Sequence, residues 1–128
     1  LLGVATYSGD GIWIEHSLVF LEYQNQHWLD VSSEVLPHLS YKNFVKEAYE
    51  MPDFPESYYQ MSAIYYKLPR KGTSIKAALE VGGLSLICDG TMKALPANQK
   101  LVCDFIENIK PNDLTLFWDK EKRLFYQK

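Results

Sequence analysis

The segment Ser57–Val81, SYYQMSAIYYKLPRKGTSIKAALEV, constrains the fold more than any other part of the chain. Its two halves alternate in the manner of β-strands, with an aromatic half before Pro69 and an aliphatic half after Gly72. Pro69 fixes the backbone angle φ for the first position of a turn, and Gly72 tolerates the left-handed conformation that closes it. The pattern predicts an antiparallel hairpin that folds back at residues 69–72.

Two further hairpins are predicted from extended segments that are joined by short polar turns. In the first, Ile12–Tyr23 and His27–Val31 are separated by three amide residues, and in the last, Leu114–Asp119 and Arg123–Lys128 are separated by three charged residues. The opening stretch, Leu1–Asp10, is a mixed apolar segment that ends in a glycine-rich turn.

Two segments have the periodicity of amphipathic helices. Ser40 is suited to cap a helix that runs to about Glu50, and Pro96 is suited to the first turn of a second helix that presents Leu101, Val102, Phe105, Ile106 and Ile109 on one side. Between the central hairpin and this second helix, the apolar run Leu84–Cys88 is predicted to be a short strand.

These elements together predict one domain over residues 1–128. Strands joined by short turns pair antiparallel, and a helix with one apolar stripe needs an apolar sheet face on which to pack. The predicted class is α+β: an antiparallel sheet built from three hairpins, with two amphipathic helices packed on it. A small barrel whose ends are closed by the helices is the alternative. A chain of 128 residues can bury a core without metal or disulfide staples.

Charge is distributed unevenly along the chain. Residues 1–56 hold nine acidic and two basic side chains, whereas the remainder holds seven acidic and eleven basic ones, within a total net charge of −3. Such halves either pack against each other or form two differently charged surfaces. Neither half has the dense Lys/Arg patch of a nucleic-acid binder, so no nucleic-acid partner is expected. No run of about 18 apolar residues exists, so no transmembrane segment is predicted.

Cysteine and histidine do not predict a metal centre. The two cysteines, Cys88 and Cys103, form either one disulfide or two buried thiols that act as small apolar residues, and the thiols are the simpler interpretation. The three histidines, His16, His27 and His38, lack metal-binding spacing, and no cofactor is expected. His16, on an apolar strand face, is predicted to be a hydrogen-bonded histidine in the core or at its boundary.

The candidate binding residues lie on the central hairpin. If one aromatic face of its first strand is the core, Tyr58 and Tyr66 on the opposite face need a cover, which is either a helix or a partner. Arg70 and Lys71 make the turn basic, so that it can contact an anionic partner. The close carboxylates Asp30 and Glu34 are explained by the start of a helix, so no catalytic residue is predicted.

Three phrases occur together in the chain: WLDVSSEVLP at Trp28–Pro37, YKLPRKGTSIK at Tyr66–Lys76, and LFWDKEKRLF at Leu116–Phe125. In these phrases the chain resembles uncharacterised exported or lipid-anchored domains of Gram-negative bacteria. The resemblance implies an extracytoplasmic location, in the periplasm or at the cell surface, and it assigns no catalytic residue. The chain begins with Leu1 rather than Met, so we expect it to be processed or trimmed, with any leader or lipid anchor upstream.

Three functions are compatible with these patterns. The first is a non-catalytic, exported binding domain that recognises a protein or carbohydrate through an aromatic strand face or the basic hairpin turn. The second is a small hydrolase with a carboxylate or histidine in a pocket between sheet and helices. The third is an acidic protein that neutralises a toxin or enzyme, with residues 1–56 covering a basic active site. The sequence does not predict the oligomeric state.

Overall fold

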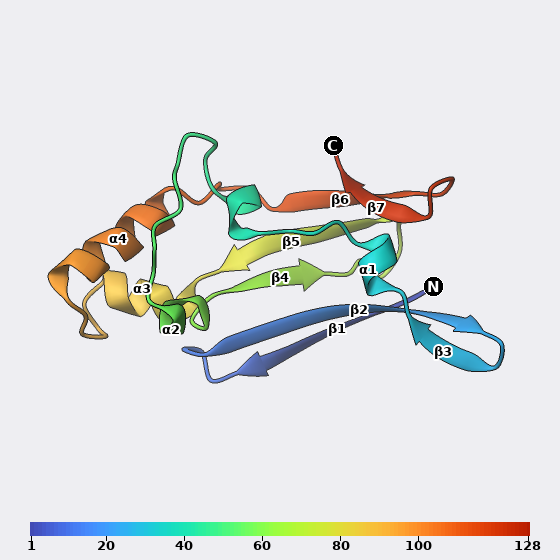
Figure 1. The fold of residues 1–128 in the computed structure, drawn as a ribbon, viewed down its shortest axis with the longest axis horizontal. Coiled ribbons are helices and arrows are strands. Elements are labelled where there is room, and N and C mark those ends of the chain that lie inside the picture. The colour runs from blue at the N-terminus through green and yellow to red at the C-terminus, as the bar shows by residue number, and fades with distance from the viewer.

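A computed structural model describes all residues, 1–128, and shows two antiparallel sheets with short helices between and beside them (Figure 1). The first sheet has the order β1-β2-β3 and contains β1 (Leu2–Gly9), β2 (Ile14–Gln24) and β3 (His27–Asp30). The second has the order β4-β5-β6-β7 and contains β4 (Ala63–Lys67), β5 (Ser74–Glu80), β6 (Leu114–Asp119) and β7 (Leu124–Gln127). The predicted α+β class and antiparallel pairing are confirmed.

The helical elements are short, apart from one. They are α1 (Ser32–Val35), the 3-10 turn η1 (Tyr41–Phe44), α2 (Glu56–Tyr59), α3 (Gly82–Cys88) and α4 (Pro96–Glu107). Proline occupies the first turn of α4, as the sequence predicts. None of the helices combines the length and the apolar character that crossing a bilayer requires.

The central hairpin is present, but its first strand is shorter than predicted. β4 and β5 pair antiparallel from Ala63 opposite Glu80 to Lys67 opposite Lys76, and Gly72 in the connection has a φ of 120°. Upstream of Ala63 the chain forms α2 instead of continuing the strand. Met61, just after α2, is buried in a cluster formed largely by helices α3 and α4. Packing against these helices, not strand pairing, therefore determines the conformation of residues 57–62.

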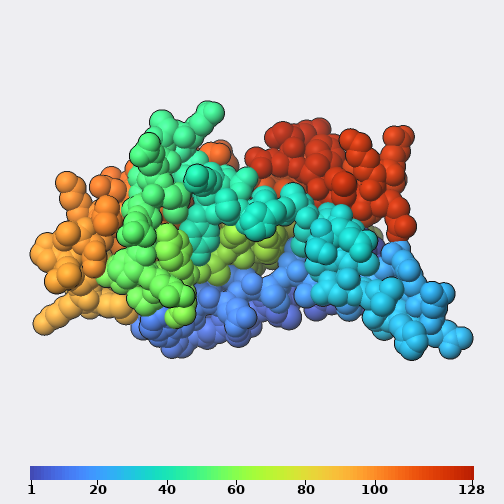
Figure 2. All heavy atoms as spheres, viewed as in Figure 1, coloured from blue at the N-terminus to red at the C-terminus, as the bar shows by residue number.

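The predicted single sheet is divided into two because the inner face of β2 lies against the second sheet. Leu18 and Phe20 of β2 share one buried cluster with Ile75 of β5, Leu116 of β6 and Phe125 of β7. A single backbone hydrogen bond, from the Ile14 amide to the Gln60 carbonyl (3.3 Å), joins the two parts. At the far end of β2, the turn end of the β2–β3 hairpin projects from the body of the protein (Figure 2).

Two local predictions are wrong. The helix expected from Ser40 to Glu50 ends after η1, because Val45 turns to extended geometry and forms a β-bridge with Ile109. Leu84–Cys88 is part of helix α3 rather than a strand, with Leu84 and Ile87 buried on one side against α4. In both segments, contacts with α4 and the residues that follow it outweigh the local pattern. The opening segment, in turn, contains the eight-residue strand β1.

A disulfide joins Cys88, at the end of α3, to Cys103 in α4 (S–S 2.05 Å). Of the two states that the sequence left open, the structure contains the bridge. It ties together the two helices that cover the second buried cluster, in which Leu84, Ile87, Val102 and Phe105 are almost fully enclosed.

We predict that the double substitution Cys88→Ser/Cys103→Ser lowers the free energy of unfolding by about 3 kcal/mol, because the bridge closes a loop of 15 residues in the unfolded chain. Urea denaturation of both proteins, with and without reductant, measures the difference. Reductant should destabilise the wild type and leave the double variant unchanged. Equal sensitivity of the two proteins to reductant would contradict the presence of the Cys88–Cys103 disulfide.

Candidate functional site

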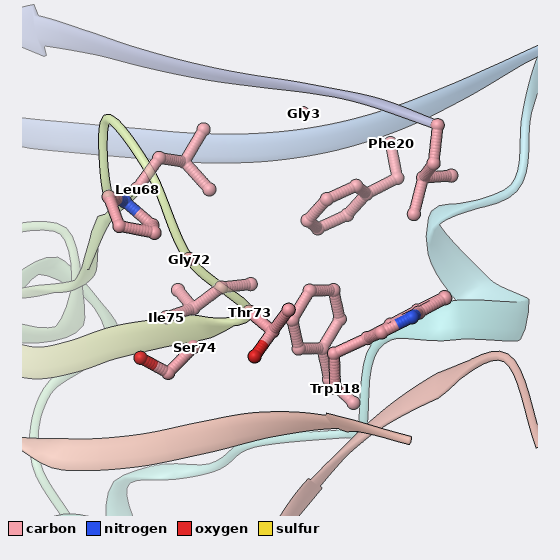
Figure 3. A pocket seen from close by; sticks show the side chains of 11 residues that line it. Gly3, Phe20, Leu68, Gly72, Thr73, Ser74, Ile75 and Trp118 are labelled. Atoms are coloured by element: carbon pink, nitrogen blue, oxygen red, sulfur yellow. The ribbon is translucent and has the colours of Figure 1, made fainter. Parts of the chain in front are cut away.

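A cavity of about 350 Å³ opens between the two sheets at the connection between β4 and β5. We call it the tip cavity. Figure 3 shows side chains from both sheets around one space. Its lining consists of Leu1, Gly3, Phe20, Leu68, Pro69, Gly72, Thr73, Ser74, Ile75, Trp118 and Phe125. No charged side chain is among them, and the only side-chain polar groups are two hydroxyls and the indole N–H.

Aromatic stacking across the sheets shapes the wall of the tip cavity. The rings of Phe20 and Phe125 lie 5.2 Å apart, and those of Trp118 and Phe125 lie 4.9 Å apart. The Trp118 amide donates a hydrogen bond to the Thr73 carbonyl (2.8 Å), which ties the connection to β6. A side chain at Gly3 would place its Cβ 2.9 Å from the Phe20 ring. Glycine at this position therefore leaves room for the ring.

A basic segment of the chain adjoins the tip cavity. Arg70 and Lys71 are exposed and lie in the chain between Pro69 and Gly72, which both line the cavity. An apolar space beside two cations fits a group with an apolar body and a neighbouring negative charge. Of the four binding residues predicted from the sequence, Arg70 and Lys71 lie in the connection beside this cavity, and Tyr66 lines a separate cavity next to His16.

The two predicted tyrosines lie apart from each other and from the tip cavity lining. Tyr58 is in α2, partly buried on the second cluster, with its ring 6.2 Å from that of Phe54. Tyr66 is in β4 and packs on the first cluster, and burial raises the pKa of its phenol. The expected common aromatic face does not form, because only Tyr66 is in a strand.

Sequence reasoning missed Phe20, Trp118 and Phe125 as lining residues. Alternation places each of them correctly in a strand, but the cavity arises only where β2 crosses the second sheet, a contact that no local pattern encodes.

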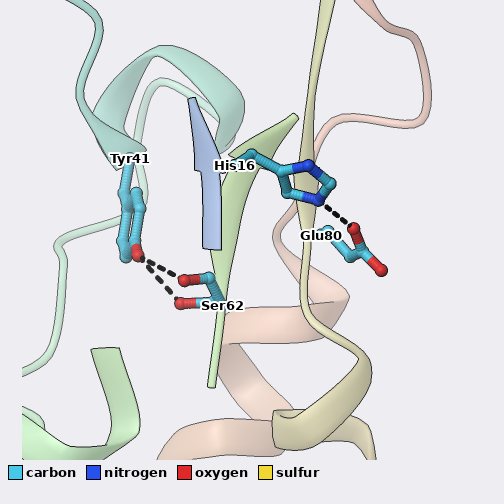
Figure 4. A network of polar contacts seen from close by, with 4 residues as sticks. All are labelled: His16, Tyr41, Ser62 and Glu80. Atoms are coloured by element: carbon cyan, nitrogen blue, oxygen red, sulfur yellow. Dashed lines mark hydrogen bonds and ion pairs between the residues drawn. The ribbon is translucent and has the colours of Figure 1, made fainter. Parts of the chain in front are cut away.

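A second constellation links the sheets through polar groups (Figure 4). His16 Nε2 of β2 lies 2.5 Å from Glu80 Oε2 of β5, and the histidine side chain is 4% exposed against 41% for the glutamate. The imidazole also packs between Tyr7 and Tyr65, with ring centroids 4.7 and 4.6 Å away. The predicted hydrogen-bonded histidine is confirmed. In the same region, the Tyr41 hydroxyl lies 2.9 Å from the Ser62 hydroxyl.

The His16–Glu80 pair has the composition of an acid–base dyad but lacks a reaction partner. No hydrogen bond joins the imidazole to a serine or cysteine, and both cysteines are in the disulfide. A cavity of about 350 Å³ lies beside His16, lined by residues of β1, β2 and β4 and by Leu68. No group of three potential metal-ligating side chains occurs in the structure. The pair cross-links β2 of the first sheet to β5 of the second.

Comparison with known proteins finds no family, no curated protein and no solved structure that matches this chain.

We predict that Glu80→Ala lowers the free energy of unfolding by about 1–3 kcal/mol, because it leaves the enclosed imidazole without its partner. Glu80→Gln should cost less, since an amide can still hydrogen-bond to Nε2. The matched control is Glu22→Ala, which removes the contact with Arg123, whose side chain is 66% exposed. Thermal and urea denaturation measure all three variants. A loss for Glu22→Ala as large as that for Glu80→Ala would contradict the cross-link.

We predict that Tyr66→Phe reduces the loss of stability at alkaline pH. Burial raises the pKa of the Tyr66 phenol in the folded protein, so the unfolded chain releases this proton first as pH rises. The contribution of the neutral phenol is therefore present at neutral pH and is lost above the ordinary tyrosine pKa. Urea denaturation at pH 8 and about pH 11 measures it. Tyr23→Phe, at an exposed site, is the control and should keep the wild-type profile.

Proposed function

We propose that the protein is a non-catalytic interaction domain that recognises a partner protein by taking one apolar side chain, flanked by acidic residues, into the tip cavity. The observation that carries this proposal is the meeting of aromatic strand residues and the basic β4–β5 connection at one apolar space. The basic connection is one of the two binding features that the sequence predicts, whereas the aromatic residues at this space are Phe20, Trp118 and Phe125 and not the predicted Tyr58 and Tyr66.

The size of the tip cavity favours a side chain over a whole small molecule. Its volume of about 350 Å³ lies near the lower end of the roughly 300–1,000 Å³ that is typical of ligand pockets. Buried aromatic and aliphatic walls of this kind hold the anchor residues of protein interfaces. A partner that inserts one leucine- or phenylalanine-sized group therefore fits the space.

The chemistry of the lining favours a protein over a carbohydrate. A sugar brings several hydroxyl groups, and each one that is buried needs a hydrogen-bond partner. Among the lining side chains, only Thr73 and Ser74 carry hydroxyls, and no carboxylate or amide side chain is present. An apolar group satisfies these walls without unpaired polar atoms.

An extracytoplasmic location forms part of the proposal. Its support is the Cys88–Cys103 disulfide together with the sequence resemblance to exported domains, because disulfides persist in oxidising compartments. The other two functions have less support. For the hydrolase, the imidazole of His16 already contacts Glu80 and two tyrosine rings. For the neutralising protein, Glu22, one of the acidic residues of the first half, is already paired with Arg123.

The test uses three acetylated and amidated pentapeptides as probes: Asp-Asp-Leu-Asp-Asp, Asp-Asp-Ser-Asp-Asp and Lys-Lys-Leu-Lys-Lys. We expect the first to shift the amide NMR signals of Gly3, Thr73 and Trp118, and the other two to bind about tenfold more weakly or not at all. These probes separate the apolar from the charge requirement.

Charge reversal tests the role of the connection. Arg70→Glu/Lys71→Glu should remove the preference for the acidic peptide, because it reverses the charge beside the tip cavity. The control, Lys93→Glu/Lys100→Glu, makes the same change near α4, at the other end of the molecule (Figure 1), and should bind like the wild type. Equal binding of all three peptides, or shifts confined to residues outside the lining, would overturn the proposal.

A further inference from the structure

Strand β1 is a free sheet edge along its whole length. It pairs with β2 from Leu2 opposite Leu21 to Gly9 opposite Ile14, and with no other strand. No backbone hydrogen bond outside that pairing involves residues 2–9. Apart from the partly buried Gly3, every residue of the strand is exposed. One row of its backbone N–H and C=O groups therefore faces solvent.

The strand lacks the features that keep sheet edges apart. Its sequence, LGVATYSG, contains no charged residue and no proline, which are the usual guards of an edge. The other free edges are shorter: β3 and β7 have four residues each and β4 has five, whereas β1 has eight. β3 also carries Asp30 and β4 carries Lys67. β1 is thus the edge best able to accept another strand.

We propose that β1 pairs with β1 of a second copy of this chain, antiparallel and with Ala5 on the two-fold axis. In this register Gly3 lies opposite Tyr7 of the second copy, and Leu2 lies opposite Ser8 of the second copy. Val4 lies opposite Thr6 of the second copy, which makes a cross-strand pair of β-branched residues. Two-fold symmetry repeats each of these contacts, and the two three-stranded sheets become one of six strands.

The side chains and the charge of β1 favour a second copy over a different partner. Leu2, Val4 and Tyr7 are 47%, 39% and 55% exposed, and pairing with the second copy covers part of each. Each chain carries a net charge of −3, but the strand itself is uncharged, so no like charges meet at the edge. A self-complementary register on a bare edge is the condition for a symmetric dimer.

Cysteine cross-linking tests the axis directly, because the protein has no free thiol. In an antiparallel pair only the residue on the axis lies opposite its own copy, at a Cα separation of about 4.5–5.5 Å that a disulfide spans. Ala5→Cys should therefore form covalent dimers on mild oxidation. Leu2→Cys is the control: the two copies of residue 2 lie about 20 Å apart in this register and should not cross-link.

Sedimentation of the protein without added cysteines provides the second measurement. We expect a monomer–dimer equilibrium between about 1 µM and 1 mM, the range of weak dimers. Val4→Lys, which places two like charges at the paired edge, should shift it to monomer by at least about tenfold in the dissociation constant. Leu29→Lys, at an exposed position on β3, should leave it unchanged.

A protein that is monomeric at all these concentrations, or Leu2→Cys that cross-links as fast as Ala5→Cys, would overturn the proposal. The two sets of results are distinguishable, because the tip cavity experiment substitutes Arg70 and Lys71, whereas this one substitutes residues of β1.

Discussion

The structure depends on the packing of β2 against the four-stranded sheet. Leu18 and Phe20 share one buried apolar cluster with Ile75, Leu116 and Phe125, and this contact joins the first sheet to the second. Without it, the three-stranded sheet would have no second layer, and an isolated small sheet with one uncovered face is marginally stable in water. The other features of the molecule follow from how the two layers meet.

Polar groups determine where along β2 the layers meet. An apolar face alone allows β2 to slide on the second sheet, because apolar contacts are not directional. The His16–Glu80 pair and the hydrogen bond from the Ile14 amide to the Gln60 carbonyl fix one register, since sliding would leave enclosed polar atoms without partners. In this register every buried side-chain polar atom has a partner. The polar contacts therefore specify the arrangement that the apolar contacts stabilise.

The sequence predicted the parts of this fold that local chemistry decides. The bounds of Leu114–Asp119, the helix start at Pro96 and the turn with Gly72 all follow from period, proline and glycine. The sequence-based prediction failed where contacts with a distant segment determine the local conformation. Val45 forms a β-bridge with Ile109, which ends the expected helix, and Met61 packs with α3 and α4, which shortens β4. The candidate site divides in the same way. Arg70 and Lys71 are visible as turn residues, whereas Phe20 and Trp118 become neighbours only through the packing of two sheets.

Both proposed interactions involve features that exist because the strands form two sheets instead of one. A single closed sheet has no edges, and its ends are filled by its own side chains. Two layers joined across β2 have instead an open end, where the β4–β5 connection and the aromatic residues form the tip cavity, and an unpaired edge at β1. Gly3 belongs to both features, because it faces Phe20 on the inner side of the sheet and lies in the free strand. A strand added at β1 would therefore lie next to one wall of the cavity, so dimerisation and partner binding would share one end of the molecule.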